Sequence, residues 1–236
     1  MILYVNGDSH TAAAEAVNPH AFAGDDGKLD PTDRRPHPDN LSVSWGYKLS
    51  KMIMNKFHCD AESASSNDRI IRTTKEWLSW HKLSEKKFKP LIIIQWSTWE
   101  REEWEYDGVR YQVNGSGIDK VPPEAAERYR NYVIGLNWNQ KTQEAHNKIW
   151  QFHKELLDAE ITHIFFNGNN DFSAISEQKD WGYNYIGPYD PKLTFHNILQ
   201  NNGFNTVHSK SWHFGADAHS FFAQFMLQYI IENNIF

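Results

Sequence analysis

The run Leu91-Ile92-Ile93-Ile94 is the feature that most restricts the fold of this chain. A strand with one face in water alternates apolar and polar residues, whereas this run is apolar without interruption. Such a strand is typical of a parallel sheet that helices cover on both faces. We therefore expect an α/β protein.

Strand-like and helix-like segments alternate along the chain. Apolar segments of strand length occupy residues 2–5, 57–61, 91–95, 161–166 and 205–208. Between them, apolar residues recur at intervals of three and four, in stripes that begin at Trp45, Ile70, Ile149 and Ala218. This alternation predicts one α/β domain over residues 1–236, with a mainly parallel sheet.

Two excursions, residues 18–40 and residues 105–140, are too long to be ordinary connections. The first carries four prolines and two glycines. In the second, Asp107-Gly108 and Asn114-Gly115 flank residues 109–113, which predicts a β-hairpin, and Pro122-Pro123 precedes a short helical segment. Both leave the sheet near the carboxyl ends of strands, where open α/β sheets bind ligands. We expect either excursion to form a lid or a specificity wall.

The first predicted strand runs directly into Gly7-Asp8-Ser9-His10. A strand followed by this motif and then a helix presents the Ser9 hydroxyl at a sharp turn. The N-terminus of that helix would stabilise negative charge that develops on a substrate, which suits a nucleophile. The alternative role for Ser9 is that of a helix cap.

Four segments together resemble the SGNH (GDSL-type) hydrolases, a family of esterases and lipases. They are Gly7-Asp8-Ser9-His10, residues 44–70, residues 92–98 and His213-Phe214-Gly215-Ala216-Asp217-Ala218-His219. The resemblance implies a flavodoxin-like, three-layer α/β/α fold with a five-stranded, mainly parallel sheet of strand order 2-1-3-4-5. The compact chain is also similar to phage-encoded members of this family.

The resemblance implies Ser9 as the nucleophile that attacks an ester carbonyl and His213 as the general base that takes its proton. A near-neutral imidazole suits that task. The alternative for His213 is an ordinary polar loop residue. His219 is the alternative base, although the helical stripe that begins at Ala218 places it within the last helix.

The acid of the triad is missing from its usual place. In the family it lies three residues before the His, where this chain has Lys210. The chain is therefore expected to use a Ser-His dyad or an irregular triad. Asp190 and Asp217 are the candidate acids, and for Asp217 a favourable position in the first turn of a helix is the other explanation.

The oxyanion hole also departs from the family. The resemblance implies the N–H of Ser9, a backbone N–H near Ala64 and Ser65, and a third-block Asn amide. Trp96-Ser97-Thr98-Trp99 stands where that Asn is expected. The candidate third donors are therefore Asn67, Ser97 and Thr98.

Two further segments have alternative interpretations. Gly168-Asn169-Asn170-Asp171 spells the third-block motif but follows the next strand along the chain, so we expect a substrate loop or a chance match, with an oxyanion donor as the alternative. Residues 99–104 are expected to form a salt-bridged helical turn. The alternative is a substrate wall in which Arg101 meets an anionic group.

Composition excludes several classes of function. There are 24 basic and 30 acidic residues, a net charge of −6, with no basic cluster, so nucleic acid is not an expected partner. No apolar run approaches the roughly 20 residues that a membrane span needs. The N-terminus lacks a signal-peptide pattern, so a cytoplasmic or virion-associated protein is expected. No metal-ligand spacing and no phosphate loop is present, so neither a metal nor a cofactor is expected.

These features predict a serine hydrolase that cleaves an ester of a small molecule or glycan, such as an O-acyl group on a carbohydrate. One alternative is a catalytically impaired SGNH-like module that binds a glycan or another ligand. Another is a flavodoxin-like binder of a phosphorylated ligand, which would use Ser9 to Thr11 and the N-terminus of the first helix. No oligomeric state is predicted.

Overall fold

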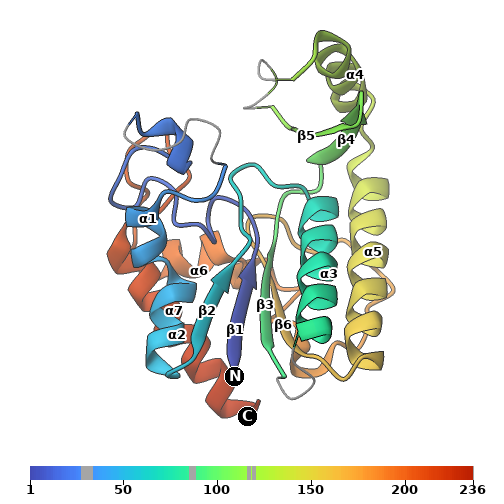
Figure 1. Cartoon of the computed structure of the whole chain (residues 1–236). Helices are drawn as coiled ribbons and strands as arrows, with labels where there is room; N and C mark the ends of the chain where they lie inside the picture. Colours follow the sequence, from blue (N-terminus) through green and yellow to red (C-terminus); the bar gives the residue numbers. More distant parts are fainter. Residues whose placement is uncertain (28–33, 85–88, 116–117, 119–120, 236) are drawn as a thin grey trace.

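The computed structural model describes residues 1–27, 34–84, 89–115, 118 and 121–235 (Figure 1). Its main sheet has four parallel strands in the order β2-β1-β3-β6. The strands are β1 (Ile2–Asn6), β2 (Lys56–Cys59), β3 (Leu91–Trp96) and β6 (Thr162–Asn167). In this register Val5 lies opposite Cys59 and Ile93, and Ile93 lies opposite Ile164. The carboxyl ends of all four strands therefore meet at one edge.

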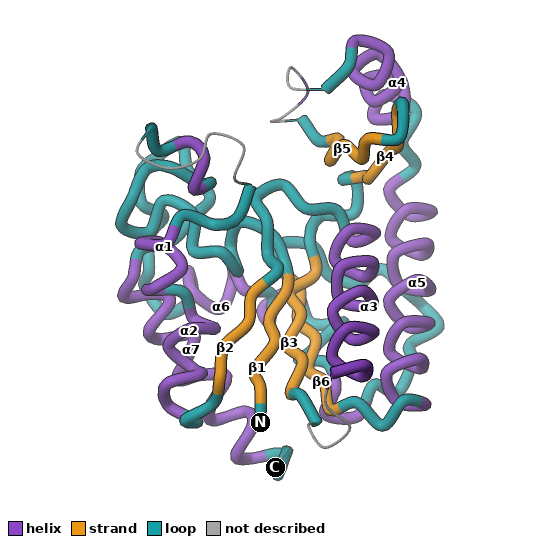
Figure 2. The backbone as a smooth tube through the Cα atoms, viewed as in Figure 1, coloured by secondary structure: helices purple, strands orange, loops and turns teal. Residues whose placement is uncertain are grey.

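Helices cover both faces of the sheet (Figures 1 and 2). One face carries α2 (Trp45–Met52), α6 (Phe195–Asn201) and α7 (Ala216–Glu232). The other carries α3 (Asn67–Ser84) and α5 (Trp138–Asp158). The predicted α/β class with a parallel sheet is confirmed.

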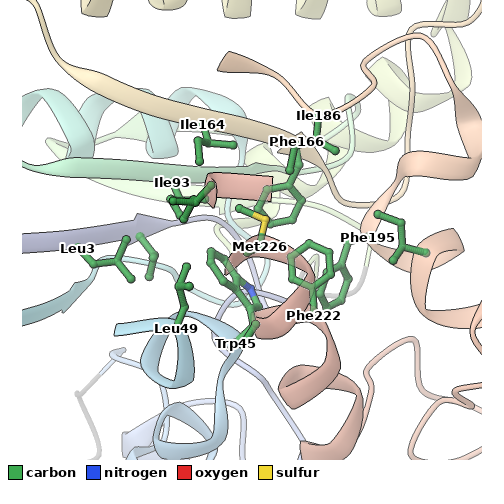
Figure 3. Packing of buried hydrophobic residues seen from close by; sticks show 14 of the residues in the cluster. Leu3, Trp45, Leu49, Ile93, Ile164, Phe166, Ile186, Phe195, Phe222 and Met226 are labelled. Carbon is green, nitrogen blue, oxygen red and sulfur yellow. The ribbon is translucent and has the colours of Figure 1, made fainter. Parts of the chain in front are cut away.

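The core is divided between these two faces, as expected for strands that alternate between them. On the first face Trp45 and Leu49 of α2 pack with Phe222 of α7 against Leu3 and Ile93, all of them fully buried (Figure 3). The opposite cluster includes Tyr4, Ile70, Ile92, Ile94, Trp96, Ile149, Phe152 and Phe165. Residues 91–96 are buried along their whole length, which explains why the run carries no polar alternation.

The predicted fifth strand is wrong, and with it the strand count and the full order 2-1-3-4-5. Residues 205–208 do not join the sheet: the N–H of Val207 donates to the carbonyl of His213, and Thr206 forms an isolated bridge with Phe214. The free edge of β6 is covered instead by Tyr185 and Ile186. Tyr185 forms an isolated parallel bridge with Phe165, and the N–H of Ile186 donates to the carbonyl of Phe165 at 2.9 Å. That edge is therefore occupied before the chain reaches residue 205.

The predicted helix after Ser9 is also wrong. Residues 8–16 form a series of turns, in which the N–H of Ala14 donates to Ser9 at 2.9 Å. Ala13 and Glu15 have φ angles of 55° and 63°. A right-handed helix cannot pass through such residues. Ser9 consequently receives no help from a helix dipole.

The described parts of the two excursions lie beside the carboxyl edge (Figure 1). Residues 18–40 contain a 3₁₀ turn, Ala23–Asp25, and lead into α1 (Pro38–Val43). In the second excursion the predicted hairpin is confirmed as β4 (Glu102–Tyr106) and β5 (Val109–Val113), with Asp107 and Gly108 at positive φ in the turn. Because β4 begins at Glu102, the helical turn predicted for residues 99–104 is wrong. The hairpin packs on α4 (Pro123–Ile134) around Val113, Ala125 and Tyr129.

We expect Leu49→Ala to destabilise the protein by about 2–5 kcal/mol, because it removes a fully buried side chain from the first core cluster. Met52→Ala on the same helix is the matched control, since Met52 is 40% exposed and should change stability by about 0.5 kcal/mol or less. Urea denaturation followed by circular dichroism measures both. Equal losses for the two variants would contradict the packing of α2.

Candidate active site

A cavity of about 1450 Å³ opens at the carboxyl edge of the sheet. Both excursions contribute to its wall, Phe22 and Arg34 from the first and Tyr111, Gln112 and Trp138 from the second. Of the site residues predicted from the sequence, those that line it are Ser9, Ala64, Thr98, Arg101 and His213. Residues from distant parts of the chain therefore meet in one hollow.

The carboxylate of Asp8 anchors the turn that carries Ser9. It is 1% exposed and accepts hydrogen bonds from Gln95 Nε2 at 2.7 Å and Ser97 Oγ at 2.9 Å. Arg101 pairs with it at 2.9 Å. Burial disfavours the charge, but the electrostatic influence of His10 and Arg101, with hydrogen bonds from the His10 N–H and the Ser97 hydroxyl, lowers the pKa of Asp8. The hydrogen bonds of the Asp8 carboxylate therefore connect the end of β1 to the end of β3.

Close packing explains the glycine of the motif. A Cβ atom on Gly7 would lie 2.3 Å from Thr11 Oγ1 and 3.0 Å from Gln95 Cβ. Thr11 Oγ1 itself donates to Gln95 Oε1 at 2.8 Å. Only a residue without a side chain fits between Thr11 and Gln95 at this position.

Ser9 is held at the cavity wall, and its hydroxyl and backbone N–H are unused. It is 6% exposed, and none of the described residues forms a hydrogen bond with its hydroxyl. No described residue accepts a hydrogen bond from its backbone N–H either. A serine in this state has both a nucleophile and a donor to offer a ligand.

A carboxylate that the sequence did not single out holds His213. Glu15 Oε2 lies 2.7 Å from His213 Nδ1 and accepts a hydrogen bond from Ser211 Oγ at 2.5 Å. Ser211 Oγ in turn accepts from the N–H of His213 at 2.9 Å. This fixes the ring and, in its neutral form, places the proton on Nδ1, so that Nε2 is the proton acceptor. Glu15, His213 and Ser9 line the same cavity.

The surroundings of Glu15 stabilise the negative charge of its carboxylate. Burial disfavours the carboxylate, but hydrogen bonds from Ser211 and His213 and the electrostatic influence of His213 and His208 lower its pKa. Glu15 is therefore an anion at neutral pH. An anion beside Nδ1 stabilises an imidazolium ring, as a catalytic base requires.

The other candidate acids and the alternative base lie elsewhere. Asp190 is exposed and caps a 3₁₀ turn by accepting from the N–H of Lys192. Asp217 lies in the first turn of α7 and accepts from the N–H of Ala218. His219 is 1% exposed inside α7, and its Nδ1 accepts from the N–H of Trp45 at 3.3 Å. Burial lowers the pKa of His219 to about 3. None of the three lines the cavity.

Most of the predicted oxyanion donors already have partners. Asn67 exchanges two hydrogen bonds with the backbone of Ser97, at 2.8 and 3.2 Å. The Ser97 hydroxyl donates to Asp8, and the Thr98 hydroxyl donates to Glu100 at 2.8 Å. The N–H of Ser65 donates to Glu62.

One backbone donor, the N–H of Ala64, and two side-chain acceptor atoms near the cavity remain without a partner among the described residues. Asn169 and Asn170 line the cavity, and the Oδ1 of each is buried without a partner among the described residues. The Asn169 amide lies 3.4 Å from Nε2 of His10, whose pKa burial lowers to about 4. The structure thus brings the loop after β6 next to the motif that carries Ser9.

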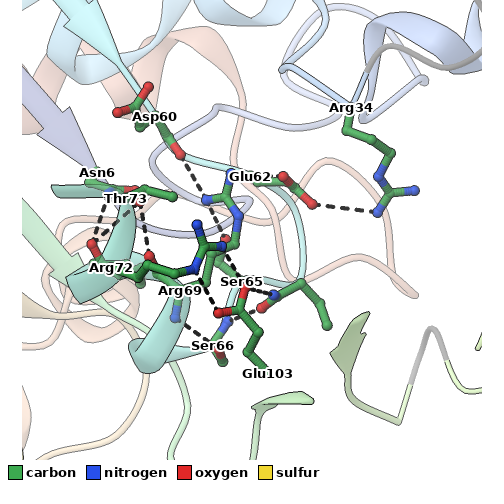
Figure 4. A network of polar contacts seen from close by, with 12 residues as sticks. Asn6, Arg34, Asp60, Glu62, Ser65, Ser66, Arg69, Arg72, Thr73 and Glu103 are labelled. Carbon is green, nitrogen blue, oxygen red and sulfur yellow. Dashed lines mark hydrogen bonds and ion pairs between the residues drawn. The ribbon is translucent and has the colours of Figure 1, made fainter. Parts of the chain in front are cut away.

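Ion pairs with carboxylates neutralise much of the positive charge on the cavity wall (Figure 4). Arg69 pairs with Glu62 at 2.8 Å, and Arg34 reaches the same carboxylate at 3.6 Å. Arg72 forms two hydrogen bonds with Glu103 of the hairpin, at 2.6 and 2.9 Å. Arg101 is likewise engaged by Asp8, so it is not free to meet an anionic substrate.

Within the part of the chain that the structure describes, no three His, Cys, Asp or Glu side chains are grouped to hold a metal ion. None of the described helices is long and apolar enough to cross a membrane.

Comparisons with known proteins give a family and distant similarity to solved structures. A family of unknown function (DUF6071) matches residues 25–147. The curated proteins contain no match. A solved carbohydrate esterase, whose active site is described as displaying divergent catalytic and non-catalytic binding functions, aligns with a TM-score of 0.45 and 17% identity. The alignment covers 98% of this chain but only 64% of that one. Similarity at this level does not transfer an activity.

We expect Glu15 to make folding stability depend on acid pH. Its folded pKa is lower than the usual 4.5, so its contribution is complete above about pH 4.5 and is lost as the pH falls toward the folded value. The stability difference between wild type and Glu15→Gln should therefore shrink as the pH falls below 4.5. Urea denaturation at several pH values measures it. A difference that is constant between pH 6 and pH 3.5 would contradict this assignment.

Proposed function

Because the chain belongs to a family of unknown function (DUF6071), its activity has to be inferred from the site, and we propose that it is a serine hydrolase of the SGNH type that cleaves an ester. Ser9 is the nucleophile, His213 the general base and Glu15 the acid that orients the base. The substrate class is an ester of a small molecule or glycan, with an O-acyl group on a carbohydrate as the specific candidate.

The contact of 2.7 Å between Glu15 and His213 carries this proposal. A serine hydroxyl is a weak nucleophile unless a nearby base accepts its proton, and the base works best when a third group orients it. Glu15 supplies that third group from the turn that follows Ser9, in place of the acid that the family has three residues before its His. An irregular triad is therefore favoured over a dyad.

In the first half of the reaction, Ser9 Oγ attacks the ester carbonyl while its proton passes to His213 Nε2. Glu15 stabilises the resulting imidazolium without taking its proton. When the tetrahedral intermediate collapses, the bond to the alcohol breaks, and the alcohol leaves with the proton from Nε2. Ser9 is then acylated.

In the second half, a water molecule gives a proton to His213 Nε2 as its oxygen attacks the acyl carbonyl. The bond to Ser9 Oγ breaks, Ser9 recovers the proton, and the carboxylic acid leaves. In both halves the carbonyl oxygen becomes negative, and the unused N–H groups of Ser9 and Ala64 are suited to stabilise it. The amide of Asn169 or Asn170 is the third donor, since Asn67, Ser97 and Thr98 are bound to other groups.

We expect the protein to hydrolyse a short-chain p-nitrophenyl ester and to react covalently with a fluorophosphonate probe. Ser9→Ala should lower kcat by about 10⁴-fold or more and abolish the labelling, because the nucleophile is removed. Release of p-nitrophenol and in-gel fluorescence measure the two effects.

Ser42→Ala is the control for this loss, since Ser42 is exposed on α1 and lies outside the cavity. Equal activity in wild type and Ser9→Ala would overturn the assignment of the nucleophile. No turnover and no labelling, together with retained glycan binding, would favour a binding module instead.

Glu15→Gln should lower kcat by about 10²- to 10⁴-fold with little change in KM, because glutamine keeps the shape of the side chain but loses its charge. Steady-state kinetics on the same ester measures this split. Asp190→Asn is the comparison, since Asp190 is one of the two candidate acids from the sequence and lies outside the cavity. A larger loss in Asp190→Asn than in Glu15→Gln would reverse the assignment.

A further inference from the structure

Two tryptophans on the cavity wall expose much of their surface. Trp212 is 68% exposed and Trp138 is 50% exposed, and both line the cavity that contains Ser9 and His213. Trp45 and Trp96, in contrast, are fully buried in the two core clusters. Leaving an indole in water forgoes the gain from its burial, so such a ring at a cavity wall indicates a surface that a ligand covers.

Trp212 is held rigidly although its ring is exposed. Its two neighbours, Ser211 and His213, both bind Glu15. The His213 carbonyl also accepts from the N–H of Val207 at 2.9 Å. The indole ring packs on one side near His196, at 5.5 Å between ring centroids. A flat apolar face is thus fixed next to the residue that serves as the base, with little entropy left to lose on binding.

Trp138 has a similarly fixed backbone on another wall. It is the first residue of α5, and Asn137 caps that helix by accepting from the N–H of Gln140 at 3.1 Å. The start of α5 lies beneath α4, on the side of the second excursion (Figure 1). The segment that carries Trp212 is attached instead to the turn after β1, through Glu15. One cavity therefore has an aromatic face on each of two separate structural units.

The size of the cavity fits a ligand of several rings. Sites for single small molecules commonly measure about 300–1000 Å³, whereas this cavity measures about 1450 Å³. A ligand that contacts both tryptophans and Ser9 has to extend along the cavity. An oligomer meets that requirement better than a monomer.

The charges favour a neutral oligomer. Aromatic faces also bind nucleobases, but proteins that do so combine them with unpaired cations that follow the phosphate backbone. Here Arg34, Arg69, Arg72, Arg101 and Arg110 of the cavity wall are each paired with a carboxylate. Among the described residues this leaves Lys210 as the one lining Lys or Arg without an ion pair, and the net charge of the chain is −6. A sugar ring has an apolar C–H face that fits an indole and hydroxyl groups that fit neutral polar side chains such as Gln112 and Asn170.

We infer that Trp212 and Trp138 are two stacking subsites for the sugar rings of a neutral oligosaccharide. The ring on Trp212 lies next to the catalytic residues, and the chain extends from there toward Trp138. The inference rests on the proposed esterase function only for the position of the scissile ester. Binding of the glycan itself requires no turnover.

The test uses the full-length Ser9→Ala variant, labelled at its N-terminus, on a glycan array that contains neutral, acidic and sulfated oligosaccharides and single-stranded DNA. We expect binding to neutral oligosaccharides of four or more residues. Adding Trp212→Ala should weaken that binding by about tenfold or more, and Trp212→Phe should restore most of it because the aromatic face returns. Trp138→Ala should weaken binding of the longest oligosaccharides more than binding of tetrasaccharides.

Trp80→Ala is the matched control, since Trp80 is 80% exposed on α3 and does not line this cavity. No binding to any neutral oligosaccharide, or binding that Trp212→Ala and Trp138→Ala leave unchanged, would overturn the inference. Preferential binding of DNA or of sulfated glycans would overturn it in favour of a polyanion site. Tryptophan-dependent glycan binding by a wild-type protein without esterase activity would support the subsites and contradict only the proposed function.

Discussion

The geometry of the site depends on the buried carboxylate of Asp8. A charge that is 1% exposed is destabilising by several kcal/mol unless it is paired and hydrogen-bonded. Gln95, Ser97 and Arg101 therefore have to stay in place around it. Gln95 lies in β3, Ser97 follows that strand and Arg101 directly precedes the hairpin. One anion therefore connects β1, β3 and the start of β4. Ser9 follows directly, with a fixed backbone and an unused hydroxyl.

The segment after Ser9 forms a series of turns instead of a regular helix, and these turns place Glu15 in contact with His213. Positive φ at Ala13 and Glu15 costs on the order of 1–2 kcal/mol for each residue. The hydrogen bonds of Glu15 with Ser211 and His213 offset this cost, and they form only if the chain leaves the helical path. The strained turn thus brings the Glu15 carboxylate next to His213 in the cavity. Strain of this kind is common at functional sites, where the surrounding structure holds it in place.

Local patterns predict the elements well where tertiary contacts do not compete with them. The apolar run of β3 and the helical stripe from Trp45 are of this kind, and parallel strands share one edge, so the position of Ser9 after β1 already places it at the ligand-binding side. Glu15 could not be predicted in this way, because it lies in an alanine-rich segment that indicates a helix, and its partner is 198 residues away. The prediction of a fifth strand was wrong for a similar reason, because contacts between distant segments decide the structure there. Residues 205–208 pair with the segment that carries His213, and Tyr185 already covers the edge of β6.

The proposed catalytic groups and the hairpin wall of the cavity are held by different kinds of contact. Asp8 and its partners are buried at the end of the sheet, where loss of one partner leaves an uncompensated charge. The hairpin and α4 instead have a small core of their own around Val113 and Tyr129. The ion pair of Arg72 with Glu103 and the bond from Ser66 N–H to Gln112 connect this unit to α3. We therefore expect substitutions in the hairpin and α4 to change which ligand the cavity accepts without disturbing Ser9, His213 or Glu15.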